Sequence, residues 1–149
     1  MKAVLFPVGE KRMIVDLEPA DDGWLSTLQE QVKGLIEPFG VLFGDEPLLY
    51  VNEEGLFNGM APNRAVMADA SMEEYGMVSP IDGRTPARRG EIYTVLYGPI
   101  LAVSYGPDDE IRDMTDDEID KVCRYVGGPE SGWQAVDDIK RGLYPRWRD

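Results

Sequence analysis

Three asparagines and an arginine lie close together in the chain, at and after an apolar segment typical of a β-strand. The segment is residues 48–52, and the polar residues are Asn52, Asn58, Asn63 and Arg64. An amide side chain offers a donor and an acceptor and can read the edge of a base or a ribose. An arginine can hold a phosphate or a carboxylate through parallel hydrogen bonds. The four residues therefore predict a pocket for a nucleotide-type small molecule.

The same residues also have a structural interpretation. Asparagine tolerates left-handed backbone and stabilises turns, which would account for Asn52 and Asn58. Asn63 could cap a short helix, and Arg64 could pair with a nearby carboxylate such as Glu53. The pocket requires that these side chains converge in space, whereas the structural roles do not.

Three further arginines, Arg84, Arg88 and Arg89, lie in residues 69–90, a stretch punctuated by proline and glycine. We predict a long loop there, and loops of that length are usually functional or mobile. Folded over the asparagine cluster, the loop would supply cations to an anionic ligand. The alternative is a solvated loop whose arginines neutralise acidic neighbours.

An acid-rich block occupies residues 106–120, with eight acidic residues and one arginine. Four of its aspartates form pairs four residues apart: Asp113, Asp116, Asp117 and Asp120. Such pairs repel on one helix face, which suggests that the block mimics a phosphate track for a basic groove on a protein partner. Acidic side chains in a first helical turn also complement the helix dipole, so a structural role is open.

Composition excludes several classes of function. The chain has 149 residues, 43% of them hydrophobic, and is expected to form a single domain, 1–149. Its 15 basic and 28 acidic residues give a net charge of −13, which excludes non-specific attraction to a nucleic-acid backbone. The absence of histidine removes the commonest general base and histidine-based metal sites. We expect no catalytic residue, no metal and no cofactor.

The single cysteine, Cys123, cannot form an internal disulfide and falls on an apolar helix face, so we expect it in the core. No apolar run approaches the length needed to span a bilayer. These features favour a cytoplasmic protein that does not bind membranes.

Several local signals predict the elements that position the candidate residues. Apolar runs at 2–6 and 12–17 indicate a hairpin, and residues 24–36 have helical spacing that Pro38 would end. Strands are predicted at 41–43, 48–52, 92–97 and 100–105, and a brief helix at 63–68. Thr115 and Glu118 form a capping box for a helix that ends at residues 127–129, and a last helix begins at Ser131. The fold class is α+β, a mostly antiparallel sheet of five to six short strands with two to four helices packed on it.

With these elements placed, residues 2–126 resemble the phage and mobile-element family of the domain of unknown function 3846. The matching segments are Tyr50-Val-Asn-Glu-Glu-Gly55, Asn58-Gly59, Pro62-Asn-Arg64, Gly90-Glu-Ile-Tyr93 and Met114-Thr-Asp-Asp-Glu-Ile119. The resemblance implies a viral or mobile-element origin and a stand-alone accessory protein, and it carries no enzymatic activity. Residues 127–149, with a C-terminal helix and a basic, aromatic tail, lie outside it.

Three functions follow as hypotheses. The first is an anti-defence protein that sequesters a nucleotide-type host signal, as a homo-oligomer if a second chain completes the pocket. The second is an acidic mimic that binds a basic groove of a host defence protein. The third is a histidine-independent enzyme.

Overall fold

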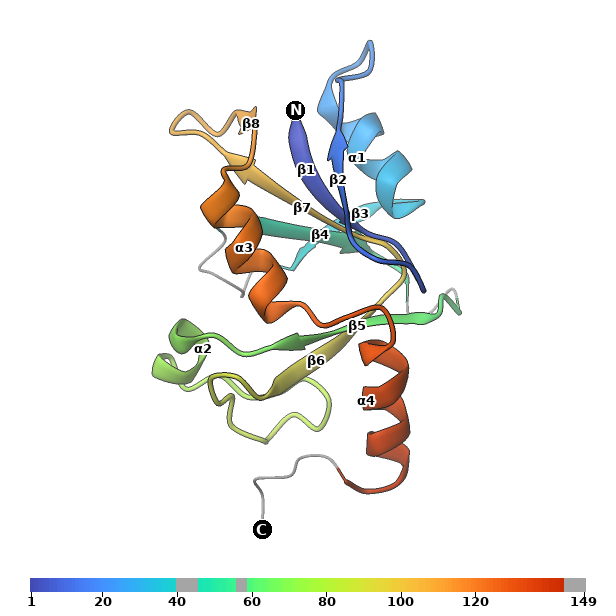
Figure 1. Cartoon of the computed structure of the whole chain (residues 1–149), viewed down its shortest axis with the longest axis vertical. Helices are drawn as coiled ribbons and strands as arrows, with labels where there is room; N and C mark the ends of the chain where they lie inside the picture. Colours follow the sequence, from blue (N-terminus) through green and yellow to red (C-terminus); the bar gives the residue numbers. More distant parts are fainter. Residues whose placement is uncertain (40–45, 56–58, 144–149) are drawn as a thin grey trace.

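The computed structural model describes residues 1–39, 46–55 and 59–143, and this part of the chain contains eight strands and four helices. Six strands form one antiparallel sheet in the order β2-β1-β7-β4-β3, with β8 paired to β7 (Figure 1). Their bounds are β1 Lys2–Phe6, β2 Met13–Asp16, β3 Ile36–Phe39, β4 Leu48–Asn52, β7 Ile100–Tyr105 and β8 Ile111–Arg112. The α+β prediction with a mostly antiparallel sheet is confirmed.

Two strands form a separate antiparallel ladder, β5 (Pro62–Met67) with β6 (Ile92–Tyr97). The chain passes from β6 into β7 through Gly98-Pro99, where Gly98 has φ 78°. Most side chains lack access to that conformation, whereas glycine adopts it freely. This bend carries the polypeptide from the small ladder into the centre of the large sheet.

The helices cover both faces of the large sheet (Figure 1). Helix α1 (Trp24–Val32) packs on one face, where Leu28 and Val32 meet Leu101 and Val103. Helix α3 (Asp116–Tyr125) lies on the other side, and its buried residues join a core shared with the sheet and with β5–β6. Helix α4 (Ser131–Lys140) packs along β5, and the short helix α2 (Ala70–Glu74) follows β5 in the chain.

Two predicted elements differ in the structure. The helix predicted at 63–68 is wrong, because this segment is strand β5, paired with β6 and buried along almost its whole length. Six residues carry too little periodicity to decide between helix and strand, so pairing with a distant segment decides. The helix predicted over 24–36 ends at Val32, because Lys33 adopts left-handed backbone with φ 63°, and Ile36 begins β3.

Other local predictions are confirmed. The hairpin β1–β2 forms, and Thr115 and Glu118 form the capping box of α3. The last helix begins at Ser131. The long loop predicted over 69–90 is wrong at its start, where Ala70–Glu74 form α2, capped by Asp69, and turns follow this helix. The strand predicted at 41–43 lies outside the described residues.

Candidate functional site

Arg64 is a cation held in the interior of the protein. It lies on β5, its side chain is 1% exposed, and its guanidinium carbon is 5.6 Å from the centre of the Phe6 ring. Nη1 donates to the carbonyl of Pro7 at 3.1 Å, and Nη2 donates to the carbonyl of Glu10 at 2.6 Å. The guanidinium therefore holds both sides of the turn that joins β1 to β2.

No described carboxylate neutralises this charge. Arg64 forms no ion pair within the described residues, and its Nε has no hydrogen-bond partner there. Burial lowers the pKa of Arg64 below its usual value, and the positive charge of Arg12 lowers it further. Arginine nevertheless stays protonated at neutral pH. A buried cation without a counter-charge is costly, and an anion brought by a ligand would offset that cost.

Asn63, next to Arg64 in β5, is completely buried and ties three segments together. Its amide nitrogen donates to the carbonyls of Phe6 and Gly98, both at 2.8 Å. Its oxygen accepts a hydrogen bond from Nη1 of Arg64 at 2.5 Å. All amide groups of Asn63 are used inside the protein, so its role is to fix β5 against β1 and to orient Arg64.

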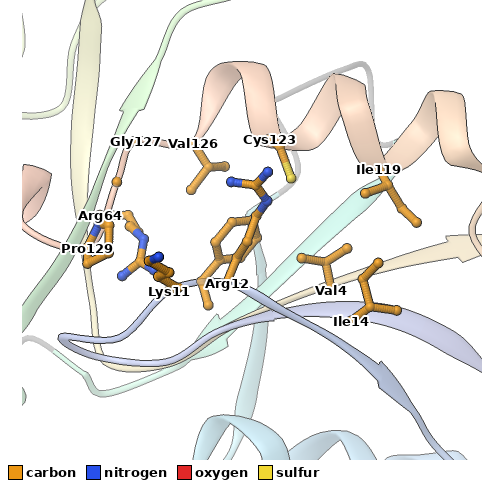
Figure 2. A pocket seen from close by; sticks show the side chains of 12 residues that line it. Val4, Lys11, Arg12, Ile14, Arg64, Ile119, Cys123, Val126, Gly127 and Pro129 are labelled. Atoms are coloured by element: carbon orange, nitrogen blue, oxygen red, sulfur yellow. The ribbon is translucent and has the colours of Figure 1, made fainter.

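A cleft of about 810 Å³ lies where the β1–β2 hairpin meets α3 and the segment that follows it. Three cations line it, and Figure 2 shows Lys11 beside Arg64 at one end and Arg12 reaching toward the helix that carries Cys123. The other lining residues are apolar or small: Val4, Phe6, Ile14, Ile119, Cys123, Val126, Gly127, Gly128 and Pro129. The cleft thus combines a cationic end with apolar walls, in a chain whose net charge is −13.

Cys123 is half-buried on the α3 side of this cleft. Burial raises the pKa of its thiol, and the nearby Arg12 acts in the opposite direction. The balance leaves a neutral thiol at pH 7, which contributes apolar surface to the wall.

Asn52 does not join Arg64. Its amide nitrogen donates to the carbonyls of Val32 and Lys33 at 3.1 Å each, and its oxygen accepts from the backbone of Glu54 at 2.9 Å. A Cβ added at Gly34 would lie 2.6 Å from that nitrogen, so the two residues fit closely together. Asn52 therefore bonds the free carbonyls at the end of α1 and stabilises the turn after β4. A role in a turn is the structural interpretation considered for it above.

The arginines of residues 69–90, which we predicted to fold over the site, do not reach the cleft. Arg84, Arg88 and Arg89 are exposed, and none of them lines the cavity that contains Arg64. The backbone N–H of Arg89 binds the Glu73 carboxylate at 2.7 Å, which holds that part of the chain near α2. Asn58 lies outside the described residues.

The acidic candidates lie at the surface, around the start of α3. Asp113, Asp116, Asp117 and Asp120 are all exposed. Asp113 precedes the helix and accepts the backbone N–H of Lys2 at 2.6 Å, so the predicted helical pair of Asp113 with Asp117 does not form. Asp116 lies 3.5 Å from the ammonium group of Lys2. Two of the four carboxylates thus contact the start of β1.

The comparisons with known proteins agree with the resemblance found in the sequence. The family model described as "Domain of unknown function (DUF3846)" matches residues 1–127. The chain belongs to this family. Neither a search of curated proteins nor a search of solved structures finds a match.

The DUF3846 region contains ten of the twelve residues that line the cleft, and Gly128 and Pro129 lie just beyond it. Helix α4 also follows the matched region. Among residues 1–39, 46–55 and 59–143, no three cysteine, aspartate or glutamate side chains gather into a group that could hold a metal ion. No helix in that same part of the chain is long and apolar enough to cross a membrane.

Sequence reasoning missed Lys11 and Arg12. Both precede β2 and become part of the site only because the hairpin brings them beside Arg64. Adjacent basic residues also occur at 88–89 and 140–141, so the pair alone would not have identified the site. The informative signal is the position of Lys11 and Arg12 between a turn and a strand. Side chains of a strand alternate between its two faces, so Arg12 and Ile14 lie on the same face.

Proposed function

We propose that this protein binds a small anionic ligand of the nucleotide type in the cleft between the β1–β2 hairpin and α3. The observation that carries the proposal is Arg64, a fully buried guanidinium that forms no ion pair with a described carboxylate and lines a cleft with Lys11 and Arg12. Phosphate groups suit the cationic end, because the exposed Lys11 and Arg12 can donate charge-assisted hydrogen bonds to phosphate oxygens, while the buried Arg64 contributes its charge at short range. The apolar walls suit the faces of a base or a similar planar group.

The proposal differs from the pocket expected from the sequence in how the ligand is held. Asn52 and Asn63 use their amides within the protein. Recognition therefore rests on cations and apolar contact instead of amides that read a base edge. We keep the role as binding without turnover, and the sequestering of a host signal by a phage or mobile-element protein stays a prediction based on the family resemblance.

Native mass spectrometry of protein purified from bacterial cells tests the proposal. We expect the wild-type protein to carry a small anionic molecule, or to bind added nucleoside phosphates at millimolar concentration, and denaturation should release it. Arg12→Ala should weaken the affinity at least about tenfold, because a charge-assisted contact is worth about 1.5–3 kcal/mol.

Arg84→Ala is the matched control, because it removes an exposed arginine away from the cleft. It should bind as the wild type does. A wild-type protein that neither carries nor binds such a molecule contradicts the proposal.

The acidic-mimic hypothesis makes the opposite prediction. Neutralising Asp117 and Asp120, which are exposed on α3, should abolish binding to a basic protein partner and leave small-molecule binding intact. A host protein retained by wild type and by Arg12→Ala, and lost from the Asp117→Asn, Asp120→Asn variant, would favour mimicry over the cleft.

A further inference from the structure

Strand β2 forms one edge of the large sheet, and its protection is limited to its four-residue length and to the charges of Lys11, Arg12 and Asp16, with no proline in the strand. Only β1 pairs with it among the described elements. It exposes Met13 (44%) and Ile14 (59%), two large apolar side chains. The opposite edge, β3, contains Pro38, which has no N–H to offer a further strand.

The hydrogen-bond pattern shows which backbone groups of β2 face outward. Met1 and Leu17 form a hydrogen-bonded pair. The Leu17 N–H donates to the Met1 carbonyl at 2.8 Å, and the Met1 ammonium group donates to the Leu17 carbonyl at 2.6 Å. In an antiparallel ladder, bonded and non-bonded pairs alternate. Val15 and Met13 therefore bond to β1, whereas the N–H and C=O groups of Asp16 and Ile14 point to the free edge. The backbone of Lys2, which lies opposite Asp16, is consistent with this alternation. Its N–H donates to the Asp113 carboxylate and its carbonyl accepts the Met114 N–H, so neither group bonds to β2.

The charges along this edge are self-complementary, and the exposed Asp16 carboxylate, whose Oδ1 accepts the Met1 ammonium group of its own chain at 2.8 Å, would be shared between that group and a partner. Arg12 precedes Ile14 by two residues and Asp16 follows it by two, so all three lie on one face of the strand. If a second β2 is placed antiparallel about Ile14, the two Ile14 residues meet at the two-fold axis. Each Arg12 then lies directly opposite the other copy's Asp16. Opposite charges at directly paired positions stabilise a sheet, and like charges there destabilise it.

We propose that two copies of this chain associate through their β2 strands, in antiparallel register centred on Ile14, to form one continuous sheet. The two Ile14 residues exchange two backbone hydrogen bonds, and each Asp16 offers its outward N–H and C=O groups to the segment around the other copy's Arg12. The contact is isologous and closes, so it forms a dimer instead of a fibre. Because the strand has four residues, the buried area is small, and we expect a dissociation constant on the order of tens of micromolar.

Sedimentation velocity from about 5 to 500 µM tests the dimer. We expect the wild type to shift from monomer to dimer across this range. Ile14→Pro removes an outward N–H without removing a bond to β1, and it should keep the protein monomeric to the highest concentration. Ile14→Thr is the matched control, because it keeps the N–H and the branched side chain, and it should weaken the dimer by less than about tenfold.

Charge exchange tests the register independently, in case Ile14→Pro does not fold. Arg12→Asp or Asp16→Arg alone should abolish the dimer, and the two changes together should restore it. A wild type that is monomeric at 500 µM overturns the proposal. So does a dimer that survives both single charge changes, because association would then use another surface. The dimer requires no ligand, so its failure would leave the proposed function untouched. Because Arg12 also lines the cleft, Asp16→Arg is the variant that alters the contact without altering the proposed ligand site.

Discussion

Arg64 and Asn63 show how two neighbouring polar residues can act as one unit inside a core. Asn63 fixes the backbone of β1 and of Gly98, and its oxygen orients the guanidinium of Arg64. Arg64 in turn holds the turn that carries Lys11 and Arg12. The positions of Lys11 and Arg12 therefore depend on the buried hydrogen bonds of Asn63 and Arg64.

Replacing Asn63 tests this internal role. Asn63→Ala removes three buried hydrogen bonds, which leaves the carbonyls of Phe6 and Gly98 without that donor and Nη1 of Arg64 without that acceptor. We expect the free energy of unfolding to fall by about 2–4 kcal/mol in urea titrations. Arg84→Ala, an exposed control, should change it by less than about 0.5 kcal/mol. A loss below about 1 kcal/mol for Asn63→Ala would contradict the role assigned to its amide.

Glu118 forms a charged pair with Arg112, and the contribution of this pair to stability depends on pH. The Arg112 guanidinium donates to both Glu118 oxygens at 2.8 and 2.9 Å and lowers the pKa of Glu118 to about 2. Because this folded-state pKa lies below the unfolded value, the pair stabilises the protein at pH above about 4.5, and the contribution is lost as the pH falls toward 2. Arg112→Met should cost about 1 kcal/mol at pH 6 after solvent screening.

Urea unfolding of wild type and Arg112→Met at several pH values measures that effect. The difference between the two proteins should shrink as the pH falls from 5 to 2.5. A difference that stays constant over this range would show that Arg112 acts through packing and not through the charge of Glu118.

At the scale of elements, β5 depends on α4, although α4 lies beyond the matched family region. Gly132 lies against β5 with no room for a side chain, since a Cβ added there would lie 2.7 Å from the Asn63 carbonyl carbon. Ser131 adds a polar link, because its hydroxyl accepts the backbone N–H of Ala65 at 3.0 Å. The helix therefore supports the strand that carries Arg64.

Adding a methyl group tests this packing. Gly132→Ala forces α4 away from β5 and should lower the free energy of unfolding by about 2 kcal/mol. Gly128→Ala is the matched control, because a Cβ there meets no atom within 4 Å. Thermal or urea unfolding compares the two variants, and equal stabilities would contradict close packing of α4 on β5.

Elements with local signals could be predicted from the sequence, and those decided by distant contacts could not. The capping box at Thr115 and the β1–β2 hairpin depend on residues close in the chain. Strand β5 depends on pairing with β6, about thirty residues later, so its six residues gave no reliable local pattern.

The same distinction explains the site. Arg64 could be selected from the sequence because of its residue type beside three asparagines. The interior partners of Asn52, and the approach of Lys11 and Arg12, require the folded chain.

The whole molecule is acidic, with a net charge of −13, whereas the cleft is lined by three cations. Long-range repulsion should keep polyanions away, while a small anion can reach the cleft. We therefore expect no binding of a 20-base-pair DNA duplex in fluorescence anisotropy at about 150 mM salt and up to about 50 µM protein. Salt-dependent binding of the duplex would contradict this distribution of charge.

The cleft of Lys11, Arg12 and Arg64 is expected to bind an anion, and an NMR titration tests this binding most directly. Inorganic phosphate and then a nucleoside monophosphate are added to ¹⁵N-labelled protein while the backbone amides and the Arg64 Nε–H are observed. We expect saturable shifts at Lys11, Arg12, Gly127, Gly128 and Arg64, and binding at least about tenfold weaker in Arg12→Ala. Shifts centred on Arg84–Arg89, or no saturable shift up to about 10 mM of either probe, would contradict the claim.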